Sequence, residues 1–197
     1  MDENNSAKEQ LDFIKRAISD SKNIVLDNGI GFIVWGIIII AGLIYTYIDV
    51  VSNGILRNDY VWIILISGGW SYNLVEWNIH KKKKRVSTFS GKILGSLWLS
   101  VGIALTILGI AGTFTGAIDG VFVSAVLSCV LGVGFFVTAQ IFNYKEGLLL
   151  STLWWIGALI MFIYPGLYVL ILMSAMMLFL QVVPGIVLYK RYKKEKI

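Results

Sequence analysis

Residues 30–48 read IGFIVWGIIIIAGLIYTYI, an apolar run without one charged side chain. A helix needs about 20 mostly apolar residues to cross the roughly 30 Å hydrocarbon layer of a bilayer. Five later runs have the same character. Each is continuously apolar, whereas helices and strands of a soluble protein alternate apolar and polar residues with a period of about 3.6 or 2. The sequence therefore predicts an all-α, polytopic integral membrane protein with six transmembrane helices in three hairpins. The predicted spans are 30–48, 60–79, 93–112, 121–142, 148–164 and 167–189.

The composition supports this class, because 57% of the 197 residues are hydrophobic and 15% are charged. Soluble domains are about 45–50% apolar and about 25% charged. The six runs leave no room for a soluble domain, so we expect one transmembrane domain over 29–190. It is preceded by a polar segment, 1–28, and followed by a basic tail, 191–197. No small-residue cleavage site follows the first run, so we expect no cleavable signal peptide.

The cations predict the orientation in the membrane. Every lysine and arginine except Arg57 falls before the first span, between spans two and three, between spans four and five, or after the last span. The positive-inside rule then places both termini in the cytoplasm of a multi-pass protein of the cytoplasmic (inner) membrane. The outer loops, 49–59, 113–120 and 164–166, are too short for an ectodomain that grips another protein.

The N-terminal segment predicts an amphipathic cytoplasmic helix over 7–27. Ser6 and Glu9 have the spacing of a capping box. Apolar residues then recur on one helical face. Such a helix can lie on the inner leaflet, pack under the bundle or dock a partner. The apolar residues of the stripe are Leu11, Ile14, Ile18 and Val25.

The hairpins resemble one another in sequence. Trp35, Trp98 and Trp155 each lie in the first half of an odd-numbered span, within the phrases VWGII, LWLSV and WWIGA. Trp35 and Trp98 are 63 residues apart, and Glu76 and Gln140 in the following spans are 64 apart. The pattern indicates a hairpin that was duplicated in parallel orientation.

Small residues predict where helices pack closely, since small side chains let backbones approach in lipid. One set recurs in the third span and another in the fourth, which predicts that these two spans form the centre of the bundle or a subunit contact. In the last span, Pro184 and Gly185 predict a kink near Leu180, either static or a hinge, with Gln181 satisfying freed backbone groups. The two packing sets are Gly95, Gly102 and Gly109, and Ser124, Ser128 and Gly132.

A candidate polar site lies in residues 71–85, SYNLVEWNIHKKKKR. Asn73, Glu76 and His80 fall on one helical face. A carboxylate within a span is costly and suggests a function, such as handling a proton or cation, with Asn73 and Gln140 as partners. Glu76 also lies only about 6 Å inside the boundary, so it is equally explained as an interfacial carboxylate oriented by cations.

The basic run after this site predicts contact with anionic lipid headgroups on the cytoplasmic side. A nucleic-acid role is not expected, because the run is held against a bilayer. One histidine and one glutamate are too few ligands for zinc, so no metal or cofactor is predicted. The single cysteine, Cys129, is expected to pack as a small hydrophobe. The headgroup-contact residues are Lys81, Lys82, Lys83, Lys84 and Arg85.

The sequence favours a non-enzymatic membrane protein that acts as an interaction or regulatory component. GxSxG, HExxH and Walker A motifs are absent from the sequence. The alternative is a small oligomeric transporter or channel, with a polar path around Asn73, Glu76 and Gln140. An intramembrane enzyme is a third hypothesis. The expected partners are the lipid bilayer, and either a second copy of the chain or a cytoplasmic protein.

Overall fold

The computed structural model describes residues 29–54, 60–82, 89–142 and 145–195. These residues form helices and short connections, with no strand among them. The predicted amphipathic helix over 7–27 and the residues Lys83, Lys84 and Arg85 lie outside the described residues.

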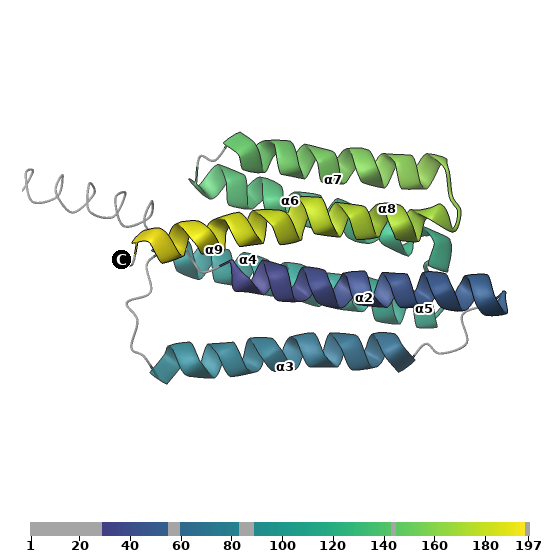
Figure 1. Cartoon of the computed structure of the whole chain (residues 1–197), viewed down its shortest axis with the longest axis horizontal. Helices are drawn as coiled ribbons and strands as arrows, with labels where there is room; N and C mark the ends of the chain where they lie inside the picture. The colour runs from purple at the N-terminus through teal and green to yellow at the C-terminus, as the bar shows by residue number, and fades with distance from the viewer. Residues whose placement is uncertain (1–28, 55–59, 83–88, 143–144, 196–197) are drawn as a thin grey trace, which may run out of the picture.

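The described residues form six helical rods. The rods lie side by side in an up-and-down bundle (Figure 1). Two of the rods contain a π-helical segment, so each is built of more than one element. The elements in chain order are α2 (Ile30–Asn53), α3 (Tyr60–Lys82), α4 (Phe89–Thr106), a π segment (Ile107–Ala111), α5 (Gly112–Phe114), α6 (Gly120–Phe142), α7 (Lys145–Ile163), α8 (Tyr168–Met176), a second π segment (Met177–Val182) and α9 (Val183–Glu195).

Five of these rods are long and apolar enough to cross a membrane, which defines a helical membrane protein. The predicted span 60–79 forms the sixth rod, α3. Its 23 residues reach about 34 Å, enough for the hydrocarbon layer. Serine, glycine and asparagine residues in its middle and second half make it less apolar than the others. The five apolar helices are Ile30–Asn53, Gly91–Phe114, Gly120–Phe142, Lys145–Ile163 and Tyr168–Arg191.

The core lies between α6, α7 and the rod formed by α8 and α9. Trp154 and Met161 of α7 and Met173 of α8 are fully buried there. The Phe135 ring lies 5.3 Å from the Trp98 ring and 6.2 Å from the Trp154 ring, measured between centroids. Small residues of α6 allow this close approach of large side chains from three directions.

The third span does not lie at the centre of the bundle, which was one of the two placements predicted for it; the other, a subunit contact, stays a prediction. In α4, Val101 is buried, and the other described side chains from 91 to 106 are at least partly exposed. The helix lies at the edge of the bundle, where it packs on α6. The fourth span, α6, is central as predicted, but its main partner is α7.

The last rod changes from α to π geometry over Met177–Val182, directly before Pro184. Proline has no N–H for the carbonyl of Leu180, and a π turn is one way to absorb this loss. The expectation for Gln181 was wrong. Its Nε2 donates to the carbonyl of Phe32 on α2, at 3.3 Å, rather than to its own helix.

The described cations lie at one end of the bundle, where α3 ends, α4 begins, α6 meets α7 and α9 ends (Figure 1). The helix α2 also begins at this end. Arg57 lies outside the described residues. The antiparallel arrangement thus gathers cations that are far apart in sequence: Lys81, Lys82, Lys92, Lys145, Lys190, Arg191, Lys193 and Lys194.

Candidate functional site on helix α3

The residues of the predicted polar site lie on two helices, α3 and α6. Asn73 faces α2, where its Oδ1 accepts a hydrogen bond of 3.2 Å from Trp35 Nε1. Glu76 is half-buried about one turn further along α3. His80 belongs to α3, but its side chain is outside the described set. Gln140 is exposed on α6, and no hydrogen bond joins it to the described part of α3.

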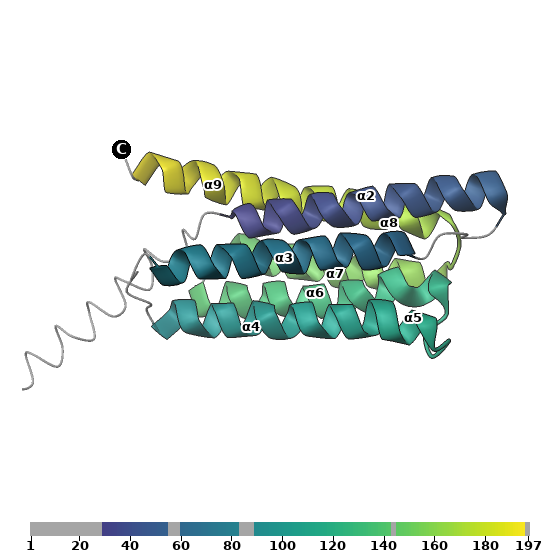
Figure 2. The same cartoon turned by 90° about the horizontal axis from the view of Figure 1, so that it is seen from below.

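Helix α3 lies on the outside of the bundle, beside α2 and α4 (Figures 1 and 2). Gly69 is its one buried residue in the described range 60–79. The core that joins α6, α7 and α8 contains no buried residue of α3. Another kind of contact must therefore hold this helix in place.

That contact is made by tryptophan, and it occurs four times in the described bundle. The indole ring lies over a glycine of a neighbouring helix, and its N–H donates to the side chain four residues after that glycine. We call this unit a tryptophan clasp. The N–H to acceptor distances are 3.2, 3.0, 3.1 and 3.2 Å. The clasps join Trp35 to Gly69 and Asn73, Trp62 to Gly42 and Thr46, Trp70 to Gly102 and Thr106, and Trp98 to Gly134 and Thr138.

The glycine and the threonine each have a physical role in the clasp. A Cβ at Gly69 would lie 2.6 Å from the Trp35 ring, so the ring needs a glycine beneath it. The hydroxyl of Thr138 donates to the carbonyl of Gly134 at 2.7 Å and accepts the Trp98 N–H at 3.2 Å. Both polar groups are thus satisfied without water, as apolar surroundings require.

Three of the four clasps hold α3. Trp62 of α3 and Trp35 of α2 clasp each other's helices, and Trp70 of α3 reaches α4. Hydrogen bonds between transmembrane helices contribute about 0.6 kcal/mol on average and up to about 1.7 kcal/mol. The helix is therefore attached by a few polar contacts rather than by a large buried core.

The clasps also allow the three hairpins of the predicted duplication to be compared. In the first hairpin Trp35 lies over Gly69, and in the second Trp98 lies over Gly134, in each case from the first helix to the second. In the third, Trp155 turns to the preceding helix, where its N–H donates to the carbonyl of Cys129 at 3.2 Å. Two hairpins share the arrangement and the third departs from it.

The outer face of α3 is a stripe of uncharged residues, which we call the α3 stripe. At its centre Gly68 has open space around the position of a Cβ. The hydroxyl of Ser71 donates to the carbonyl of Ser67 at 2.8 Å, so it needs no partner outside the helix. The α3 stripe consists of the exposed residues Tyr60, Ile63, Ile64, Ser67, Gly68, Ser71, Leu74, Val75 and Asn78.

The predicted packing residues have different surroundings. A Cβ at Gly132 would meet Trp155 Nε1 at 2.3 Å, whereas one at Gly95 would meet nothing within 4 Å. Gly102 lies under Trp70, and Gly109 lies against Leu127. In α6, Ser124 and Ser128 are both buried.

The predicted hinge lies in a tight helix crossing. A Cβ at Gly185 would lie 3.0 Å from the carbonyl oxygen of Gly29, at the start of α2. Pro184, next to it, is half-buried. At the same end of the bundle, Lys81 and Lys82 end α3, and their contact with headgroups stays a prediction.

Three buried polar groups were not singled out as sites from the sequence. Asp49 is buried in α2, which runs to Asn53 rather than ending at residue 48, and it accepts a hydrogen bond of 2.7 Å from Asn53 Nδ2. Gln181 Oε1 and Trp154 Nε1 are buried without a hydrogen-bond partner in the described structure. Within the described residues, no group of three His, Cys, Asp or Glu side chains is placed to hold a metal ion.

Comparison with known proteins adds no family to this description. No family model matches the chain, and no curated protein or solved structure is similar to it. The fold and composition therefore define the class, a helical membrane protein, and the function has to be inferred from α3 and its surroundings.

Proposed function

We propose that this chain is a non-enzymatic integral membrane protein that acts through protein interaction, with the α3 stripe as its contact surface inside the membrane. The observation that carries the proposal is the contrast between α3 and its neighbours. Helix α3 is the least apolar of the six rods. Its outer face exposes the polar side chains of Ser67, Ser71 and Asn78. The small residues at the centre of this face, Gly68 and Ser71, let another helix approach closely, and close packing drives helix association in lipid.

The occupant of the α3 stripe that we propose is a second copy of this chain. Two copies inserted with the same orientation present Gly68 and Ser71 at the same depth. The described stripe carries no charged side chain, so its symmetry mate would meet no like charge. Most soluble oligomers are symmetric pairs or their multiples, and the same geometry lets α3 meet α3 about an axis normal to the membrane.

The polar path of the transporter alternative receives less support from the geometry. Asn73 is engaged by Trp35, and Gln140 is exposed on a different helix. A continuous path would need Asn73, Glu76 and Gln140 to line one space. We therefore propose the interaction role alone.

The proposed location is the cytoplasmic membrane, with both termini in the cytoplasm. The gathering of described cations at one end of the bundle supports this orientation. Reporter fusions at Ser87 and after Ile197 should report the cytoplasm, and a fusion at Gly116 the exterior. A fusion at Ser87 that reports the exterior would reverse the topology.

Cysteine crosslinking in intact membranes tests the interaction. In a Cys129→Ala background, Ser71→Cys should form a disulfide-linked dimer under mild oxidation, because Cys129 is the chain's single cysteine. Ile156→Cys is the matched control. It is exposed on α7 and, like Ser71, lies about 16 Å from the basic end of its helix.

A dimer at Ser71→Cys that is absent at Ile156→Cys, and that Gly68→Leu weakens, is the expected result. No dimer at Ser71→Cys in membranes would overturn the proposed contact. Capture of a different protein at Ser71→Cys would overturn the second copy as the occupant.

A further inference from the structure

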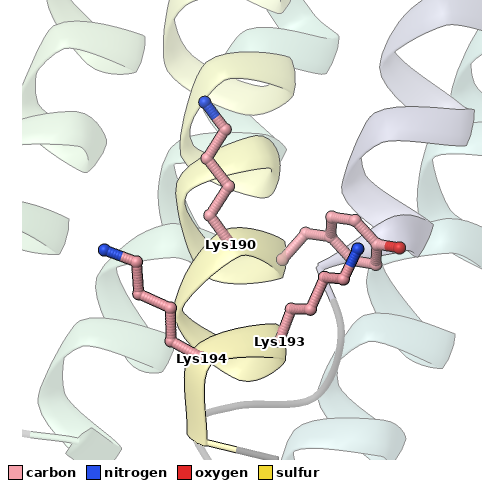
Figure 3. A pocket seen from close by; sticks show the side chains of 4 residues that line it. Lys190, Lys193 and Lys194 are labelled. Carbon is pink, nitrogen blue, oxygen red and sulfur yellow. The ribbon is translucent and has the colours of Figure 1, made fainter. Parts of the chain in front are cut away.

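The last turns of α9 form a hollow of about 300 Å³ that is lined by Tyr189, Lys190, Lys193 and Lys194. Lys190 and Lys194 extend to one side of the helix and Lys193 to the other (Figure 3). We propose that this hollow binds the phosphodiester headgroup of an anionic phospholipid in the leaflet at the basic end of the bundle. The site is independent of the α3 stripe and of any self-association.

The charge of the hollow points to an anionic ligand. Three ammonium groups are carried by two adjacent turns of one helix, Lys190 on the first and Lys193 and Lys194 on the next. Helix α9 carries four cations over 190–194 and one acidic residue, Glu195 at its end, so this turn keeps a net positive charge. Each ammonium is carried on a flexible four-carbon stem, so it can turn toward a phosphate placed over the helix.

The depth of the hollow selects a lipid rather than a free anion. The apolar part of the last rod ends at Leu188, and Tyr189 follows at the position typical of an interfacial aromatic residue. From Lys190 to Lys194 the helix rises about 6 Å. The headgroup layer of one leaflet is about 5–7 Å thick. The three lysines therefore span the layer in which lipid phosphates lie, while the helix before them contacts the acyl chains.

The expected strength follows from the charge. One lysine near an anionic surface raises the affinity for anionic lipid about fivefold. Neutralising all three lysines should therefore lower that affinity roughly 100-fold. A lysine-to-arginine change keeps the charge and should keep most of the affinity.

Lipid binding to the full chain in neutral detergent tests the site. Dioleoyl phosphatidylglycerol and dioleoyl phosphatidylcholine are added in turn, and the bound lipid is counted by native mass spectrometry. The test variant is Lys190→Gln/Lys193→Gln/Lys194→Gln, and the matching arginine triple variant tests charge alone. The control is Lys92→Gln/Lys145→Gln, which removes cations from the same end of the bundle but from other helices.

We expect the wild-type chain and the control to retain phosphatidylglycerol in preference to phosphatidylcholine, and the glutamine triple variant to lose that preference. Equal binding of the two lipids by the wild-type chain would overturn the proposal. So would a control that loses as much affinity per charge as the triple variant. Inorganic phosphate or glycerophosphoglycerol that binds as tightly as the intact lipid would overturn the assignment to a lipid.

Discussion

Helices α6 and α3 both carry small residues in their middle. Those of α6 are covered by other helices, whereas in α3 Gly69 is covered and Gly68 and Ser71 are not. In α6, Ser128 is fully buried and its hydroxyl lies 3.2 Å from Met173 Sδ, while Gly132 lies under the Trp155 ring. In α3, Gly68 and Ser71 face outward with open space around Gly68. Small residues thus mark a surface on which a helix can be packed closely, and in α3 none of the described residues covers that surface.

The two helices are also held by different forces. The α6–α7 hairpin buries Trp154 and Phe135 in a continuous apolar core. Helix α3 depends on three tryptophan clasps and contributes Gly69 as its one buried residue in the described range 60–79. The first arrangement resists local opening, whereas the second allows α3 to change partners at a smaller cost in free energy.

Exchanging glycine for leucine on the two helices gives the largest expected difference. Gly132→Leu should destabilise the monomer by about 3 kcal/mol or more, because even a Cβ would meet Trp155 at 2.3 Å. Gly68→Leu should change monomer stability by less than about 0.5 kcal/mol. Thermal unfolding in detergent, followed by size-exclusion chromatography, measures both. Equal destabilisation by the two substitutions would show that the α3 stripe is buried in the monomer.

Replacing an indole by a smaller phenyl ring, which has no N–H, compares the clasps themselves. Trp35→Phe and Trp98→Phe should each cost at least the hydrogen bond, about 0.6–1.7 kcal/mol, plus the lost packing of the larger ring. Hydrogen–deuterium exchange should rise throughout α3 in Trp35→Phe, since only the Trp62 and Trp70 clasps then hold that helix. In Trp98→Phe the increase should be confined to α4, because the Phe135 ring still packs against the substituted side chain. A uniform increase in both variants would contradict the difference between the two regions.

Gln181→Met and Asn73→Leu compare how much stability a polar group in the core and a polar group in a clasp contribute. Gln181 makes one long hydrogen bond, of 3.3 Å, and its Oε1 has no partner among the described residues. An apolar side chain of similar size should therefore be neutral or stabilise by about 1 kcal/mol. Asn73→Leu, which leaves the Trp35 N–H without its acceptor, should instead destabilise by about 1–2 kcal/mol. Similar losses of stability in both variants would contradict this assignment.

The smallest effect is expected for Glu76→Gln. The side chain is half-buried and lies beside the α3 stripe rather than on it. Thermal stability should change by less than about 0.5 kcal/mol, and crosslinking at Ser71→Cys should be unaffected. A shift above about 1 kcal/mol, or a loss of crosslinking, would restore Glu76 as a functional group in the membrane.

Hydropathy alone predicts most of the secondary structure of this chain. The run 30–48 and its four equally apolar counterparts form helices long enough to cross a bilayer. The helix ends are less predictable, since α2 continues to Asn53 and is closed by Gly54, whose φ of 74° is the left-handed geometry that glycine adopts most easily. A boundary residue such as Asp49 has low hydropathy and still lies inside a helix.

The sequence by itself determined the class of protein, because apolar length and the positions of cations act through the bilayer and need no knowledge of neighbouring helices. Only the tertiary structure decided the use of each small residue and each tryptophan. The sequence predicts both Gly132 and Gly95 as packing residues, yet one lies beneath an indole ring and the other has open space around it. Gln181 likewise contacts α2 rather than its own helix. Hydropathy does not tell which face of a spanning helix points to other helices and which to lipid. Apolar side chains are compatible with both surroundings.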